Sequence, residues 1–261
     1  MKIITFLSDF GYKSSYVAQM KAIVSRISDA RIIDITHDIS AQNIMEGAYV
    51  LYSSVDHFPD GTVHVAVVDP GVGTSRKGIV ITTQKQVFIG PDNGLLIPAA
   101  RKQGDFIVYS IDDSKYVNNK ISNTFHGRDI FAPVAAHITN GVPFDRIGIR
   151  TNNYVNLDFG RCEITPKSAY GEVIFIDDFG NIITNIDGDL LLKVLKHDSK
   201  IMVFTEKNKE QMVFVKSYNY VKKGSFLATI GSSDLLEIDI NQANAAKKLK
   251  IKIGDKIKIL F

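Results

Sequence analysis

Cysteine is almost absent from this sequence of 261 residues, in which Cys162 stands alone. A single cysteine cannot form a disulfide bond within the chain, and this usage is typical of proteins in a reducing compartment. Nothing beside Cys162 indicates a reactive thiol. The sequence therefore excludes a fold that depends on internal disulfides.

Long hydrophobic runs are also missing. The apolar stretch over residues 1–7 reaches Ser8 and Asp9 too soon to serve as a signal peptide. No apolar run approaches the roughly 20 residues that a membrane-spanning helix needs. We therefore expect a soluble, cytoplasmic protein without a membrane partner.

A strong excess of one charge is the third absence, because the formal net charge is only +3. This balance gives no support to nucleic-acid binding, so we expect no nucleic-acid partner. Lysines do gather near the C-terminus, where they alternate with isoleucines in the manner of the solvated side of a strand pair. They are Lys247, Lys248, Lys250, Lys252, Lys256 and Lys258.

The first 150 residues alternate between strand and helix patterns. Strands are predicted over 3–7, 31–35, 63–68 and 78–82, and helices over 17–27 and 43–55. This alternation favours an α/β fold with a mostly parallel sheet and flanking helices. Ligands of such sheets bind beyond the carboxyl ends of the strands, where Asp9 and Asp69 both stand.

Short strands dominate the second part of the chain. They are predicted over 172–176, 182–185, 201–204, 212–215, 226–230, 235–240 and 256–260, with a short helix over 241–249. Many short strands with turn signals are typical of a small barrel or sandwich. Both periodicities weaken between these parts, so we predict an N-terminal domain over 1–155, a linker over 156–167 and a C-terminal domain over 168–261.

The segment Phe125–Pro133 is the most informative one. It places His126, Gly127, Arg128 and Asp129 in a row between aromatic residues, at the start of a predicted helix. Histidine titrates near neutral pH and therefore suits proton transfer. The alternative is a hydrogen-bonded core histidine beside a surface ion pair of Arg128 and Asp129.

A glycine-containing loop, residues 69–76, follows the third predicted strand. A dinucleotide-binding fingerprint would need a third glycine and a following helix, whereas Arg76 stands there and a strand is predicted next. A P-loop would need Gly-Lys followed by Ser or Thr. Either the loop is a turn without a functional role, or it brings Asp69 and Arg76, at its two ends, into one pocket.

Metal binding is the next question. The remaining histidines show no paired ligand spacing: His37, His57, His64, His137 and His197. Four other side chains could in principle converge on a metal ion: Asp9, Asp69, His126 and Asp129. The cationic Arg76 and Arg128 beside them argue against it, because like charges repel in a pocket. We therefore expect no metal.

Taken together, several segments resemble the S-adenosyl-L-methionine (SAM) hydroxide adenosyltransferases, or SAM hydrolases, which are relatives of the fluorinase and chlorinase. They follow one another along nearly the whole chain: Ser8–Gly11, Val68–Gly73, Gly90–Gly94, Phe125–Pro133, Asp177–Asn181 and Gly231–Ser233 with Leu236–Ile238. The resemblance implies an N-terminal α/β domain and a small C-terminal β-barrel. It also implies a homotrimer with sites at the subunit interfaces.

The resemblance implies roles for individual residues. Asp69, Arg76 and His126 correspond to the family's catalytic Asp-Arg-His set, which the halogenating relatives lack, so water is favoured over halide as nucleophile. Asp9 would bind the ribose hydroxyls. The other implied substrate-binding residues are Asn93, Asp177, Asn181, Ser232, Ser233 and Glu237, with Ser233 standing where the fluorinase has arginine.

The implied reaction is attack of water on the ribose C5′ of SAM, which yields adenosine and L-methionine and requires no cofactor. The sulfonium leaves as a neutral thioether and needs no general acid, so catalysis must orient and deprotonate water. Arginine cannot serve as the base, which leaves His126 or Asp69. The alternatives are a metal-dependent phosphohydrolase and a non-catalytic nucleoside-binding protein.

Overall fold

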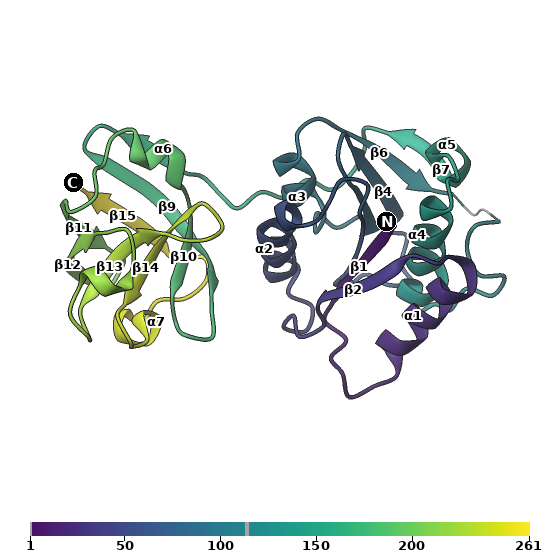
Figure 1. Cartoon of the computed structure of the whole chain (residues 1–261), viewed down its shortest axis with the longest axis horizontal. Helices are drawn as coiled ribbons and strands as arrows, with labels where there is room; N and C mark the ends of the chain where they lie inside the picture. Colours follow the sequence, from purple (N-terminus) through teal and green to yellow (C-terminus); the bar gives the residue numbers. More distant parts are fainter. Residues whose placement is uncertain (1, 113–114) are drawn as a thin grey trace. The chain divides into compact units, whose positions relative to one another are not determined.

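The structure is a computed structural model that describes residues 2–112 and 115–261. The chain divides into two compact units, Met1–Asp158 and Phe159–Phe261 (Figure 1). Residues 153–162, which include the border, have no regular secondary structure. The domain limits predicted from the sequence, with a linker over 156–167, stay a prediction.

The first unit is built on a sheet that has seven strands among the described residues, in the order β2-β1-β3-β5-β4-β6-β7. They are β1 (Ile3–Ser8), β2 (Arg31–Thr36), β3 (Val63–Val67), β4 (Gly78–Thr83), β5 (Val87–Pro91), β6 (Phe106–Ile111) and β7 (Gly148–Thr151). Strands β2, β1, β3 and β5 pair in parallel, whereas the pairs β5–β4, β4–β6 and β6–β7 are antiparallel. Only β4 and β7 therefore run against the others, so the described sheet is mostly parallel, as predicted.

Helices cover both faces of this sheet. Figure 1 shows α1 (Tyr16–Ile27) and α4 (Ala132–Thr139) on one face, with α2 (Ile44–Ser54) and α3 (Ile97–Lys102) on the other. A 3₁₀ turn η1 (Val55–His57), a π-helical turn η2 (Gly127–Phe131) and the short α5 (Phe144–Ile147) complete the unit. Because both faces are covered, β1 is buried along its whole length, as its mostly apolar sequence indicates.

The second unit is a closed barrel. Its strands are β8 (Glu163–Thr165), β9 (Ser168–Ile176), β10 (Ile182–Asp187), β11 (Lys200–Phe204), β12 (Lys209–Phe214), β13 (Phe226–Ile230), β14 (Leu235–Ile240) and β15 (Lys256–Leu260). They pair in the order β10-β14-β13-β12-β11-β15-β9-β8, and β9 also pairs with β10. That last pairing closes seven strands into a ring and leaves β8 attached to β9. The predicted barrel is confirmed, and the sandwich alternative is wrong.

Three short helical turns accompany the barrel: α6 (Gly188–Leu192), η3 (Tyr218–Tyr220) and α7 (Ala245–Leu249). Ile257 and Ile259 of β15 point into the barrel core, while Lys256 beside them is exposed, as the alternation predicts. The strand prediction is wrong for the other four lysines: Lys247 and Lys248 lie in α7, within the helix predicted over 241–249, and Lys250 and Lys252 follow that helix outside any strand. No helix in the described ranges has both the length and the apolar character needed to cross a membrane.

Candidate functional site

The carboxyl edge of the parallel strands holds the first candidate residues. Asp9 follows β1 and Asp69 follows β3, and these strands are parallel neighbours with Ser8 opposite Val67. The two aspartates therefore emerge at the same edge, as the strand pattern predicted.

Arg76 links Asp69 to His126. Its Nε donates a hydrogen bond to Asp69 Oδ1 over 2.9 Å, and its Nη2 donates to Asp69 Oδ2 and, over 2.8 Å, to Nδ1 of His126. Only 11% of the Arg76 side chain and 5% of the Asp69 side chain are exposed to solvent. The structure thus brings the three predicted catalytic residues into one hydrogen-bonded set, although up to 57 positions separate them in the sequence.

The hydrogen bond from Arg76 defines the state of His126. A guanidinium only donates, so Nδ1 of His126 must accept and the neutral ring carries its proton on Nε2. Burial lowers the pKa of His126 and the charge of Arg76 lowers it further, although Asp69 and Asp129 act in the opposite direction. His126 is therefore neutral at neutral pH, with its basic nitrogen facing Arg76.

Close packing of two loops maintains this set. Gly73 has a φ of 77°, and a Cβ at this position would lie 2.3 Å from the carbonyl oxygen of Asn123. Only glycine allows the loop of residues 69–76 to approach the segment before His126 so closely. The Arg76 guanidinium also lies 5.3 Å from the centre of the Phe131 ring.

Asp9 is held by neighbouring backbone. Its Oδ2 accepts a hydrogen bond from the Gln42 amide over 2.8 Å. The preceding Ser8 hydroxyl contacts Nδ1 of His37 over 2.7 Å and accepts from the Phe10 amide over 3.3 Å. His37 is fully buried and supports the turn that carries Asp9. Sequence reasoning missed this role, because no spacing pattern relates His37 to Ser8.

Asn93 supports the backbone beside Asp69. Its Nδ2 donates to the carbonyl of Val68 over 2.8 Å, and its Oδ1 accepts from the Leu95 amide over 3.2 Å. Both ends of the amide group thus bind main chain. Its predicted part in substrate binding stays a prediction.

In the barrel unit, Asp177 and Asn181 form one tight turn. Asp177 Oδ1 accepts from the amides of Phe179 and Asn181 over 3.0 and 2.9 Å, and its Oδ2 accepts from Asn181 Nδ2 over 2.9 Å. Asn181 Nδ2 also lies 3.5 Å from the hydroxyl of Tyr218. The predicted pair therefore forms a hydrogen-bonded turn that contacts Tyr218.

Two pockets meet at Asp177 and Tyr218. The larger has a volume of about 800 Å³ and is also lined by Asn181, while the smaller, of about 290 Å³, is also lined by Ser232 and Glu237. Among the predicted residues of the barrel, these pockets gather Asp177, Asn181, Ser232 and Glu237. Ser233 is buried next to Ser232 and does not line either pocket in the described chain.

Strand β14 carries two buried carboxyl groups, Glu237 and Asp239, on one face. Burial raises the pKa of Glu237 to about 7 and that of Asp239 to about 8, and the charge of Asp177 adds to both. Asp239 is completely buried, and its side-chain oxygens have no hydrogen-bond partner within the described chain.

Sequence reasoning missed Asp239 and Tyr218. The alternation of apolar and acidic residues along 235–240 would have identified Asp239, because residues two apart share a face of a strand. No comparable signal marks Tyr218, because its contact with Asn181 depends on how two separate loops fold.

The described residues contain no group of three or more His, Cys, Asp or Glu side chains placed to hold a metal ion. Of the four side chains considered from the sequence, Asp69 is bound by Arg76 and Asp129 by Arg128. These two carboxylates are thus bound by guanidinium groups, while Asp9 accepts from the Gln42 amide.

The chain matches two family models. The SAM hydroxide adenosyltransferase N-terminal domain covers residues 4–148, and the corresponding C-terminal domain covers residues 171–258. An (R)-S-adenosyl-L-methionine hydrolase of Methanocaldococcus jannaschii is 40% identical, over 100% of this chain and 97% of its own length. A fluorinase of Actinopolyspora mzabensis is 26% identical, over 72% of this chain and 73% of the fluorinase.

A solved structure agrees with these matches. The crystal structure of an uncharacterized conserved protein from Thermotoga maritima superposes with a TM-score of 0.94 at 40% identity, covering 99% of this chain and 100% of that one. Since the two family models together span most of both units, the chain belongs to the SAM hydroxide adenosyltransferase family.

Proposed function

We propose that this protein hydrolyses SAM to adenosine and L-methionine, without a cofactor. The observation that carries the proposal is the hydrogen-bonded set of Asp69, Arg76 and His126 at the carboxyl edge of the sheet. Family membership and the full-length similarity to a protein named (R)-S-adenosyl-L-methionine hydrolase support it.

The reaction forms a bond between the water oxygen and the ribose C5′ and breaks the bond between C5′ and sulfur. The electron pair of the broken bond stays on sulfur, which becomes a neutral thioether. The remaining task is to orient the water and to receive its proton. A nearly buried guanidinium is suited to stabilise the charge that develops on the water oxygen.

The three side chains divide this task. Asp69 fixes the guanidinium of Arg76 through two hydrogen bonds, and Arg76 in turn faces Nδ1 of His126. Arg76 cannot accept a proton. Histidine ordinarily has a higher pKa than aspartate, so we assign the proton of the water to Nδ1 of His126, whose hydrogen bond with Arg76 then gives way.

We assign the rest of the substrate to the other predicted residues. Asp9 binds the ribose hydroxyls, with Asn93 nearby along the same sheet edge. The barrel contributes Asp177, Asn181, Ser232, Ser233 and Glu237, which bind the remaining parts of the nucleoside and of the methionine. Support comes from the barrel pockets, which four of these residues line.

We further propose a cytoplasmic homotrimer whose sites lie at the subunit interfaces. The predicted site residues fall on both compact units, with Asp9, Asp69 and His126 on one and Asp177, Asn181 and Glu237 on the other. Cyclic homo-oligomers commonly complete a site with residues from two subunits.

The direct test is incubation of the purified protein with SAM, followed by chromatographic measurement of adenosine and methionine. We expect equimolar release of both, with no loss after treatment with a metal chelator. Loss of activity on chelation together with release of phosphate from phosphate esters would favour the metal-dependent phosphohydrolase instead. Binding of adenosine without any turnover would identify a nucleoside-binding protein.

A further inference from the structure

Asp129 is a buried carboxylate that the proposed chemistry does not use. It lies in η2, three residues after His126, and only 1% of its surface is exposed. Burial by itself would raise its pKa, but hydrogen bonds from Arg128, Ser122 and Asn118 lower the pKa below its ordinary value. Asp129 is therefore charged and fully engaged, and the surface ion pair considered as an alternative from the sequence is wrong in this respect.

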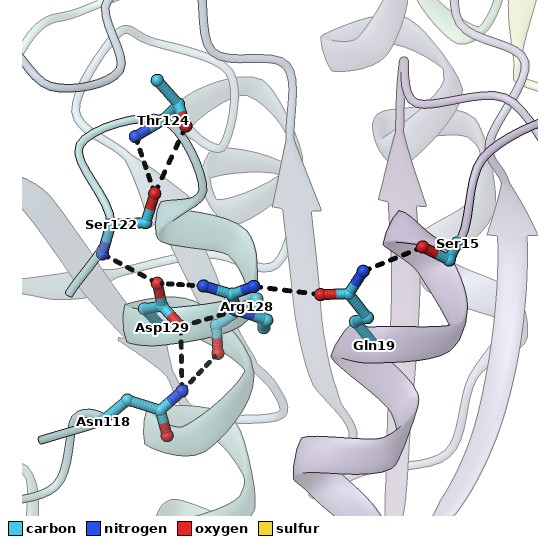
Figure 2. A network of polar contacts seen from close by, with 7 residues as sticks. All are labelled: Ser15, Gln19, Asn118, Ser122, Thr124, Arg128 and Asp129. Atoms are coloured by element: carbon cyan, nitrogen blue, oxygen red, sulfur yellow. Dashed lines mark hydrogen bonds and ion pairs between the residues drawn. The ribbon is translucent and has the colours of Figure 1, made fainter. Parts of the chain in front are cut away.

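Four hydrogen bonds converge on this carboxylate (Figure 2). Arg128 donates from Nε to Oδ1 over 2.7 Å and from Nη2 to Oδ2 over 2.8 Å. Asn118 Nδ2 donates to Oδ1 and the Ser122 amide donates to Oδ2, each over 2.9 Å. We call these four residues the Asp129 network.

The Asp129 network joins the residues before His126 to the residues after it. Ser122 stands four residues before His126 and Asp129 three residues after it, so their hydrogen bond fixes both ends of a short loop. A backbone hydrogen bond adds to this, because the main-chain N–H of Asn118 donates to the carbonyl of Asp129 over 2.9 Å. Two further contacts of Arg128 anchor this loop to the rest of the unit: Nη1 donates to Gln19 of α1 over 2.9 Å, and the guanidinium lies 4.9 Å from the centre of the Phe125 ring.

The same loop supports the segment that carries Arg76. The carbonyl of Asn123 lies next to Ser122 in the chain and occupies the place that a side chain at Gly73 would need. A movement of residues 122–124 would therefore shift the loop over 69–76 as well. Both partners of the 2.8 Å contact between Arg76 Nη2 and His126 Nδ1 thus depend on the position of this one segment.

We propose that Asp129 is a positioning residue, which holds the loop over residues 118–126 so that His126 faces Arg76. This inference rests on the proposed hydrolase function for its kinetic consequence. The Asp129 carboxylate thereby sets the distance between Arg76 and His126. It does so without a hydrogen bond to either residue, because its hydrogen bonds come from Arg128, Asn118 and Ser122.

The test compares Asp129→Asn with wild type in kinetics and in crystal structures. A misplacement of about 1 Å costs roughly 100-fold in rate, so we expect kcat to fall about 10- to 100-fold while KM stays within about threefold. The distance from Arg76 Nη2 to His126 Nδ1 should exceed hydrogen-bonding range in the variant crystal. A folded variant with kcat within about twofold of wild type, or with that hydrogen bond intact, would overturn the proposal.

Two further variants keep the test decisive. Asn118→Ala removes the side-chain hydrogen bonds to Asp129 Oδ1 and to the carbonyl of Arg128 but leaves the ion pair of Arg128 and Asp129. It should therefore lower kcat by less than Asp129→Asn does, and it provides a test if Asp129→Asn fails to fold. Asp56→Asn is the matched control, because Asp56 binds Lys102 and Gln103 outside the site and its loss should leave kcat unchanged. If wild type releases no adenosine, the proposed function fails, while the distance comparison between crystals still decides the role of Asp129.

Discussion

At the scale of single residues, one hydrogen bond determines what His126 can do. Its Nδ1 accepts from Arg76, so the ring can gain a proton only where it now contacts the guanidinium. Burial and Arg76 keep the ring neutral, which is the state that a proton acceptor needs.

The first prediction concerns His126→Ala, which removes the proton acceptor and leaves Asp69 and Arg76 paired. We expect kcat for SAM hydrolysis to fall by roughly two to four orders of magnitude, as is typical for the loss of an acid–base group. The measurement is steady-state adenosine release by a variant whose circular dichroism matches wild type. Unchanged turnover would remove His126 from the mechanism.

The second prediction concerns Asp9→Ala and binding. A carboxylate beyond a strand end is suited to two vicinal hydroxyls, and each charge-assisted hydrogen bond contributes about 1.5–3 kcal/mol. We therefore expect KM to rise at least about 10-fold while the proton chemistry of His126 continues. Calorimetry with adenosine measures this directly, and wild-type affinity in the variant would place the ribose elsewhere.

At the scale of elements, β14 carries two buried carboxyl groups, which make the stability of the barrel depend on pH. Leu236, Ile238 and Ile240 enter the barrel core, so Glu237 and Asp239 lie together on the opposite face. Asp239 has no hydrogen-bond partner within the described chain, whereas Glu237 is hydrogen-bonded to Tyr218. Burying carboxyl groups in this way is costly unless they take up protons. The raised pKa of each group reflects this cost.

The third prediction concerns Asp239→Asn and pH. The pKa of Asp239 is about 8 in the folded chain, against an ordinary value of 3.8. Because the folded value is the higher one, wild type loses stability as pH rises from about 4 to about 8, and the variant lacks this loss. At about 1.4 kcal/mol per pKa unit, the free energy of unfolding of the variant relative to wild type should grow by roughly 2–4 kcal/mol between pH 5 and pH 8.

Urea denaturation at the two pH values provides the measurement. Asp189→Asn is a suitable control, because Asp189 is an exposed aspartate of α6 in the same unit. A relative stability that does not change with pH would show that Asp239 gives up its proton without cost.

At the scale of the whole molecule, the two compact units carry separate halves of the predicted residue set. Unit Met1–Asp158 holds Asp69, Arg76 and His126, and unit Phe159–Phe261 holds Asp177 and Glu237. Each unit has a core of its own, one between the sheet and its helices and one inside the barrel. The proposed reaction requires both sets of residues to act on the same substrate molecule.

The fourth prediction is that inactive His126→Ala and inactive Asp177→Ala chains restore activity when they are mixed under subunit exchange. In a trimer with shared sites, some interfaces then pair two intact halves. Adenosine release by the mixture, with sedimentation of the active species as a trimer, is the measurement. Verified exchange without recovered activity, or a monomeric active enzyme, would contradict the shared-site arrangement.

The sequence by itself determined the elements and the polar residues at their ends. Apolar runs of period two or 3.6 identified the buried strands and the amphipathic helices, because those periods follow from backbone geometry alone. Asp9 and Asp69 were found at one sheet edge for the same reason, since parallel neighbouring strands end together.

Only the tertiary structure decided how distant residues meet. Arg76 reaches His126 because Gly73 lets one loop pack against Asn123 of another, and no local pattern encodes that approach. The burial of Asp239 and the closure of the barrel by β9 and β10 likewise depend on segments far apart in sequence. Local periodicity specifies which face of an element is buried, whereas contacts between loops depend on the packing of the whole unit, which is why the chemistry of His126 follows from the fold.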